Sequence, residues 1–171
     1  MELRSLFIDF NAYFASVEQQ EQPHLRGRPI AVVPVLTKNA SCIAASYEAK
    51  RCGVKTGSLV HEAKALCPDI TMVLARPALY VRYHHRLIAL INRHIPIAHV
   101  GSIDEMACEM IGRERQRPNA VAIAQAIKAG RRRLQLDEGL ALRRRHDGGE
   151  EGAFGPHHRQ PVEGSEGAGA G

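Results

Sequence analysis

The chain of 171 residues is long enough for one domain with an inserted lobe, and its 44% hydrophobic content is ordinary for a globular protein. It has no apolar run near the roughly 18 residues that cross a bilayer, and its N-terminus lacks the apolar segment and cleavage site of a signal peptide. We therefore expect a cytoplasmic protein with no membrane partner. The formal net charge of +5 suits a polyanionic partner, nucleic acid or nucleotide, but many basic proteins bind neither.

The first half of the sequence has the alternating strand and helix patterns of a compact α/β protein. Its apolar runs and turn residues predict, in chain order, a strand at 3–10, a helix at 12–20, a turn at 21–29, strands at 30–35 and 41–46, and short helices at 47–53 and 59–68. Gly53 and Pro68 are typical residues for the ends of those two short helices.

The second half begins with a longer predicted helix, from about Leu79 to His94, because apolar side chains recur there every fourth residue and line one face. A strand pair is expected at 97–111. A last helix is predicted from Asn119, a good N-cap, to Gly130, a good C-cap.

The composition changes after Gly130. Residues 131–171 hold 9 of the 15 glycines, while the basic excess lies in residues 1–130, with 16 Lys+Arg against 11 Asp+Glu. Such a segment cannot bury enough apolar surface to offset the entropy lost on ordering. It is either a disordered C-terminal tail or an out-of-frame translation that follows loss of the native frame near Gly130. Composition alone does not separate these alternatives.

Cysteine and histidine spacing gives no sign of a zinc site. The four cysteines lie far apart without a C-x-x-C pair, and we expect buried free thiols at Cys42, Cys52, Cys67 and Cys108. His84 and His85 also have no partner at metal-ligand spacing, so we expect no zinc role for them.

The segment "HVGSIDEMACEM" places two adjacent carboxylates, Asp104 and Glu105, inside a stretch that otherwise resembles a strand entering a core. Side chains alternate along a strand, so the two acids face opposite sides unless a turn lies between or before them. The preceding "VGS" supplies such a turn and would put both acids at the mouth of a hairpin. An Asp-Glu pair in a turn is more often simply solvated.

Asp9 is a third acid in an apolar setting, between Ile8 and Phe10 at the end of the first strand. It is either an N-cap of the next helix or a carboxylate that a cation or hydrogen bonds compensate. If the first strand lies beside the 97–111 hairpin, three carboxylates converge on one point. Hard oxygen ligands in a partly open site suit Mg²⁺. Two such ions about 4 Å apart can activate an attacking hydroxyl and stabilise a leaving pyrophosphate.

Four motifs together carry a specific resemblance: "FIDFNAYFASVEQ", "AASYEAKRCGVKTG", "EAKALCPD" and "SIDE". Their order and spacing over about residues 5–130 resemble the Y-family translesion DNA polymerases, the group of bacterial DNA polymerase IV and the catalytic subunit of polymerase V. The resemblance implies two Mg²⁺ ions held by Asp9, Asp104 and Glu105, with the carbonyl of Phe10 as a further ligand. The same three acids would be the catalytic residues.

The resemblance also implies a site for a deoxynucleoside triphosphate. Phe14 is similar to the family's steric gate, a ring that excludes a 2′-hydroxyl, whereas we expect Tyr13 to be a plain core aromatic. Tyr47 matches the family's triphosphate contact, and its helical spacing from Lys50 and Arg51 would let the three reach phosphate oxygens together.

Lys50 departs from the family pattern, which usually has arginine in "YEAR". Lysine is a point charge rather than a bidentate fork, so triphosphate binding is either weaker or transferred to Arg51. Without the resemblance, a solvated helix face would explain this Lys-Arg pair equally well.

The element order resembles the family's palm, a ferredoxin-like βαββαβ sheet, and implies an α/β (α+β) fold. The implied domains are a palm at 1–20 and 79–130, a small inserted fingers subdomain at 21–78, and the disordered or out-of-frame tail at 131–171. The resemblance further implies a last palm strand after Gly130, a thumb and a little-finger domain. The sequence shows none of them, so the last palm strand is apparently missing, and an open sheet edge is a stability liability.

Two functional hypotheses follow. In the first, the chain is a fragment of a DNA-directed DNA polymerase, a nucleotidyltransferase whose parent extends primers past damaged template in DNA repair. In the second, it is a non-catalytic remnant or a module that binds Mg²⁺ and a dNTP. We expect weak binding of primer-template DNA and weak or no polymerase activity, and any sliding-clamp contact would belong to the full-length parent.

Overall fold

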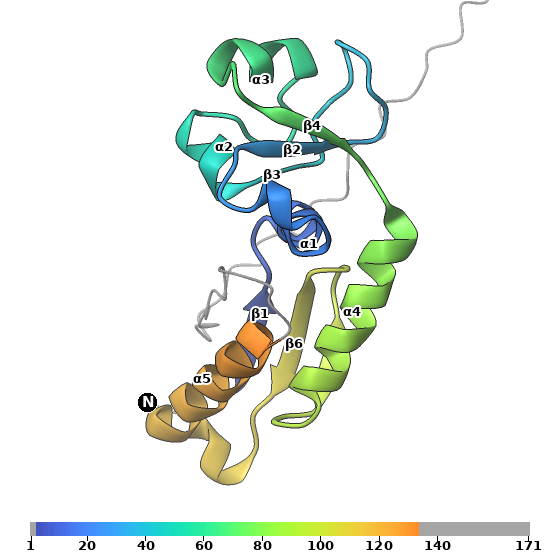
Figure 1. Cartoon of the computed structure of the whole chain (residues 1–171). Helices are drawn as coiled ribbons and strands as arrows, with labels where there is room; N and C mark the ends of the chain where they lie inside the picture. The colour runs from blue at the N-terminus through green and yellow to red at the C-terminus, as the bar shows by residue number, and fades with distance from the viewer. Residues whose placement is uncertain (1–2, 134–171) are drawn as a thin grey trace, which may run out of the picture.

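The computed structural model describes residues 3–133, so the predicted tail lies almost wholly outside the described residues. The elements are β1 (Ser5–Asp9), α1 (Tyr13–Glu21), η1 (Pro23–Leu25), β2 (Ile30–Val33), β3 (Ala44–Ala45), α2 (Tyr47–Arg51), α3 (Val60–Leu66), β4 (Thr71–Leu74), α4 (Pro77–Ile91), β5 (Ile97–Val100), β6 (Glu105–Glu109), η2 (Gly112–Arg115) and α5 (Arg117–Arg133). They form a mixed α/β fold with two small sheets, and α1 lies between the sheets (Figure 1). None of the helices within residues 3–133 is long and apolar enough to span a membrane.

The first sheet is antiparallel, in the order β1-β6-β5. Side chains alternate along β1 and β6, so one face is apolar and fully buried; it carries Leu6, Ile8, Phe10, Met106, Cys108 and Met110. The other face of these two strands carries Asp9 and Glu105 and is only partly buried. The alternation thus puts the acids on the opposite side of the sheet from the core.

Helices α4 and α5 pack on the apolar face of this sheet (Figure 1). The fourfold spacing predicted for α4 is confirmed, because Leu79, Tyr83, Leu87 and Ile91 are all buried. From α5, Ala124 joins the same core cluster.

Both predicted ends of the last helix are wrong. Helix α5 begins at Arg117, and the Asn119 amide donates to the carbonyl of Arg113 instead of capping the helix. The helix also continues through Gly130, where a Cβ atom would lie 2.4 Å from Leu90 Cδ1 on α4. Gly130 therefore lets two helices approach closely, a use of glycine that local sequence does not distinguish from a helix end.

The second sheet has the order β3-β2-β4, with β2 antiparallel to β3 and parallel to β4. All four residues of β2 are buried, as expected of a central strand covered on both faces. The sequence analysis did not identify β4, a four-residue strand whose partner lies about forty residues earlier in the chain. Helices α2 and α3 share a second core cluster with this sheet.

The chain enters the second sheet at β2 and leaves it after β4, at Arg76. The predicted lobe of residues 21–78 spans this whole excursion, although the domain bounds stay a prediction. The thiol prediction holds for Cys42, Cys67 and Cys108, which are buried and free. It is wrong for Cys52, which is free but exposed at the C-terminal end of α2.

Candidate active site

Asp9 and Glu105 lie directly opposite each other at the end of the β1–β6 ladder. The amide of Phe10 donates to the carbonyl of Asp104 at 3.0 Å, so the Asp9–Glu105 pair is of the non-hydrogen-bonded kind, with Cα atoms only about 4.5 Å apart. Opposite residues project to the same face, and like charges placed there destabilise a sheet. This pairing confirms that the first strand lies beside the hairpin.

Asp104 lies in the bend of residues 102–104, between β5 and β6. Its Oδ1 accepts a 2.6 Å hydrogen bond from Ser102 Oγ, which in turn accepts from the Asp104 amide at 3.3 Å. The turn predicted from "VGS" is therefore present, and its serine holds the Asp104 carboxylate. Gly101 lies against Glu105, where a Cβ would be 3.7 Å from Glu105 Oε2.

The donor set suits a hard cation, because carboxylate oxygens and a main-chain carbonyl are the ligands that Mg²⁺ prefers. Within residues 3–133, however, no three His, Cys, Asp or Glu side chains are already grouped around one metal position. Asp9 and Glu105 share a face, while the Asp104 carboxylate is turned to Ser102. The residues fit Mg²⁺ in their chemistry, although the three carboxylates are not grouped around one position in this structure.

The turn that joins β1 to α1 is strained. Ala12 has φ 53° and ψ 31°, the left-handed region that non-glycine residues rarely adopt. No side chain caps α1, so the alternative that Asp9 is its N-cap is excluded. The Phe10 side chain is buried in the core, and its amide is bound to the Asp104 carbonyl. The strained turn thus follows directly after the predicted ligand residues.

Tyr13 is a buried core aromatic, as predicted, and its hydroxyl donates to the carbonyl of Tyr80 at 2.7 Å. Burial, followed by the nearby charge of Asp104, raises its pKa. Phe14 is only partly buried, and its ring centroid lies 4.5 Å from that of Tyr80. The ring predicted to select the sugar therefore rests on an aromatic from α4.

The predicted phosphate contacts lie on α2, which Ser46 caps by accepting a hydrogen bond from the amide of Ala49. Lys50 Nζ lies 5.5 Å from the centroid of the Tyr47 ring, within the range of a cation–π contact. Arg51 Nη2 is instead 3.9 Å from Glu48, on a largely exposed side chain. The structure brings Tyr47 and Lys50 together and directs Arg51 to a different neighbour.

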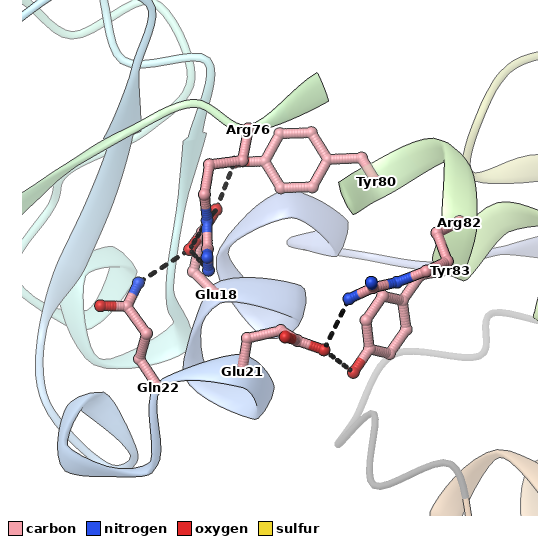
Figure 2. Close-up of polar contacts among 7 residues, drawn as sticks. All are labelled: Glu18, Glu21, Gln22, Arg76, Tyr80, Arg82 and Tyr83. Carbon is pink, nitrogen blue, oxygen red and sulfur yellow. Dashed lines mark hydrogen bonds and ion pairs between the residues drawn. The ribbon is translucent and has the colours of Figure 1, made fainter. Parts of the chain in front are cut away.

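Figure 2 shows a buried polar cluster around Glu18 that the sequence analysis did not identify. Arg76 forms an ion pair with the fully buried Glu18, Tyr80 donates to Glu18 Oε1 at 2.7 Å, and Gln22 donates to Oε2 at 2.9 Å. The hydrogen bond to Glu18 raises the pKa of Arg76, and burial raises that of Tyr80. The sequence signal for this cluster was Glu18 itself, a charged residue that directly follows the apolar part of "AYFASVEQQ".

A second acid on α1 makes a similar but more exposed set of contacts. Tyr83 donates to Glu21 Oε1 at 2.7 Å, and Arg82 lies 3.3 Å from the same oxygen (Figure 2). The Glu21 side chain is 29% exposed, against 0% for Glu18. Both acids tie α1 to the first turns of α4, directly after the chain leaves the second sheet.

Comparison with known proteins identifies the family of this chain. The model of the impB/mucB/samB family matches residues 8–134, and the chain belongs to that family. It is 36% identical to DNA polymerase IV of Pelotomaculum thermopropionicum over an alignment of 125 residues. That alignment covers 72% of this chain and 31% of the relative. For DNA polymerase IV of Saccharolobus solfataricus the identity is 32%, over 72% of this chain and 36% of the relative.

Solved structures give the same result. The insertion ternary complex of Dbh DNA polymerase matches with a TM-score of 0.66 and 31% identity, over 74% of this chain and 38% of that one. DinB from Sulfolobus solfataricus matches with a TM-score of 0.65 and 29% identity, over 75% of this chain and 39% of DinB. The resemblance to the palm and fingers of a Y-family polymerase is confirmed, and the chain spans about a third of the length of these relatives.

Proposed function

We propose that this chain carries the metal- and nucleotide-binding part of a DNA-directed DNA polymerase whose parent activity is template-directed nucleotidyl transfer in translesion synthesis and DNA repair. The observation that carries the proposal is the pairing of Asp9 with Glu105 on the face away from the core, with Asp104 next in the chain. Two opposed carboxylates are costly in a sheet, and divalent cations offset that cost. Y-family DNA polymerases generally use divalent metal ions.

Asp9, Asp104, Glu105 and the carbonyl of Phe10 would hold two Mg²⁺ ions. Bound there, the metals would supply activation of an attacking hydroxyl and charge stabilisation at a leaving pyrophosphate. The protein's part is to present the carboxylates: β1 and β6 fix Asp9 and Glu105 across one ladder, and Ser102 holds Asp104 until the site fills.

The nucleotide would lie between this sheet and α2. Tyr47 and Lys50 lie together on α2 and present a hydroxyl and a cation suited to triphosphate oxygens. Phe14 would meet the sugar, supported from behind by Tyr80. This assignment makes the nucleotide a deoxynucleoside triphosphate.

Because the chain spans only part of its relatives' length, we also propose a second candidate function for the isolated chain. It would be a module that binds Mg²⁺ and dNTP without processive synthesis. The chain spans 31% of one DNA polymerase IV and 36% of another. In the family, primer-template DNA is gripped mainly by parts outside this span. We therefore propose weak DNA binding by this chain, with clamp contacts confined to the full-length parent.

The test is calorimetric titration of the chain with dATP in the presence of Mg²⁺. We expect binding by the wild type, loss of binding in Asp104→Asn, and unchanged binding in Glu109→Gln. Glu109 is a matched control because it lies on the same strand and face as Glu105 but at the far end of the ladder. Absence of binding by the wild type, or equal losses in both variants, contradicts the proposed site.

Primer extension separates the two candidates. The binding module predicts little or no template-directed synthesis by the 171-residue chain. Robust extension that disappears in Asp104→Ala would show that the chain is itself a working polymerase.

A further inference from the structure

Helix α4 contacts the bend that carries Asp104 through a histidine to which the sequence analysis gave no role. His84 Nδ1 lies 2.7 Å from the carbonyl oxygen of Ile103, the residue just before Asp104. A carbonyl only accepts, so this distance requires a proton on Nδ1. At 2.7 Å the contact is at the short end of the N–H···O range.

Within the described residues, the other hydrogen bonds of this bend run to its own residues and to the end of β1, where the Phe10 amide donates to the Asp104 carbonyl. The amides of Gly101 and Ser102 donate to the Glu105 carbonyl at 2.9 and 3.2 Å, and the Ser102 hydroxyl donates to Asp104 Oδ1. These bonds close the bend and tie it to the end of β1, and among the described residues none of them reaches α4 or α5. His84 supplies a direct bond from the helix layer to the bend.

His84 lies on a part of α4 that contacts with α1 hold in place. Tyr80 and His84 are four residues apart and lie on neighbouring turns of one helix face. Tyr80 is bound to the buried Glu18, and Tyr83 is bound to Glu21, so α1 anchors this part of α4. The imidazole therefore extends from a fixed helix, and the Ile103 carbonyl is held relative to that helix.

We propose that His84 is a positioning residue for Asp104: its Nδ1–H bond to the Ile103 carbonyl fixes the bend that carries Asp104, at the end of the ladder where Asp9 and Glu105 pair. The consequence for nucleotide binding rests on the proposed function, whereas the consequence for the bend does not. The substitution His84→Leu removes the donor. His84→Asn restores a donor at the bond separation of Nδ1, and His85→Leu is the matched control, because His85 is the exposed neighbour on the same helix.

The first readout is amide hydrogen exchange at Gly101, Ser102 and Asp104 in the full 171-residue chain. Loss of one hydrogen bond predicts about fivefold faster exchange at these amides in His84→Leu. We expect rates near wild type in His84→Asn and in His85→Leu. Nitrogen-15 spectra of the imidazole should show His84 of the wild type protonated at Nδ1. Unchanged exchange in His84→Leu, or a neutral ring protonated only at Nε2, overturns the proposal.

The second readout is calorimetric titration with dATP and Mg²⁺. We expect about fivefold weaker binding in His84→Leu and recovery in His84→Asn. If the wild type binds while His84→Leu binds equally well and exchanges equally slowly, the inference fails and the proposed function stands. If no variant binds but exchange in the bend accelerates as expected, the positioning of the bend is supported and the proposed function fails.

Discussion

In the β1-β6-β5 sheet the acidic side chains Asp9 and Glu105 lie on the face away from the helices, whereas near the β3-β2-β4 sheet the basic side chains Lys50 and Arg51 lie on the exposed surface of α2. These four charged side chains lie outside the apolar core of their own region. Between the regions, Glu18 of α1 is buried with Arg76 at the exit from the second sheet.

These charges differ in how firmly the structure holds them. Asp104 and Lys50 have local partners, Ser102 and the Tyr47 ring, and both residues are at least partly exposed to solvent. Glu18 accepts hydrogen bonds from three side chains and has no exposure to solvent. A buried charge cannot lose its partners without a large penalty, so we expect Glu18 to serve the structure and the exposed charges to serve binding.

The strongest test of this contrast is Glu18→Ala against Glu21→Ala. Glu18→Ala strips Tyr80 of its acceptor and opens a cavity, and we expect a loss of about 3 kcal/mol in the free energy of unfolding. Glu21 has the same kinds of partner but is partly exposed, so Glu21→Ala should cost at most about 1 kcal/mol. Urea denaturation measures both values. Equal losses would show that burial is not what distinguishes the two acids.

Buried and exposed thiols provide the next comparison. Burial, with a smaller effect of Glu114, raises the pKa of Cys108 to about 11 from an ordinary 9.0. Because the folded-state pKa is the higher one, the stability that this thiol contributes is intact below about pH 9 and is lost as the pH rises towards about 11.

The slope of that loss is about 1.4 kcal/mol per pH unit. Cys108→Ala should remove this part of the alkaline loss, which denaturation at a series of pH values measures. In the folded chain, iodoacetamide should modify the exposed Cys52 and leave Cys108 unmodified. Equal alkylation of the two thiols would contradict the burial of Cys108.

Two glycines show where prediction from sequence succeeds and where it fails. Gly53 follows α2 with φ 92°, so a left-handed residue ends that helix as its local sequence predicts. Gly130 lies inside α5 because Leu90 of α4 is too close for a Cβ atom. The first role depends on the residue's own backbone, whereas the second depends on a helix forty residues away. No local pattern carries the second kind of information.

The same distinction applies to the strands and the site. Strand alternation and the preceding "VGS" predicted a turn beside Asp104 and Glu105, and the family motifs selected Asp9, Asp104 and Glu105. The strand β4 and the Glu18–Arg76 pair depend on partners far away in the chain, so neither had a local signal strong enough to predict it. The contact of His84 with the Ile103 carbonyl requires the crossing of α4 over the hairpin, which the sequence alone does not fix.

Substitution of Gly53 and Gly130 by alanine distinguishes a requirement for a left-handed backbone from a requirement for close helix packing. Gly53→Ala should cost about 1 kcal/mol through left-handed strain, and truncation of the neighbouring Leu66 should not relieve it. Gly130→Ala should also cost about 1 kcal/mol, as overpacking against Leu90 outweighs the gain in helix propensity. In a Leu90→Ala background, Gly130→Ala should become neutral or stabilising. A double-mutant cycle by urea denaturation measures this coupling, and additive effects would exclude the contact as the cause.

The smallest expected effects concern the cations of α2. Lys50 lies over the Tyr47 ring, whereas Arg51 is near Glu48 and would have to leave it to reach a phosphate. We therefore expect Lys50→Ala to weaken the binding of Mg²⁺ and dATP by about fivefold and Arg51→Ala by about twofold, with unfolding free energies changed by less than about 0.5 kcal/mol.

Lys64→Ala is the matched control, since Lys64 is an exposed lysine on the neighbouring α3. Calorimetric titration at two salt concentrations ranks the three variants, and added salt should reduce the effect of Lys50→Ala because the attraction is between exposed charges. A larger loss in Arg51→Ala than in Lys50→Ala would mean that the arginine leaves Glu48 for the triphosphate. In that case Arg51 has taken over the role of the family's arginine, and the contact of Lys50 with Tyr47 is a surface feature of α2.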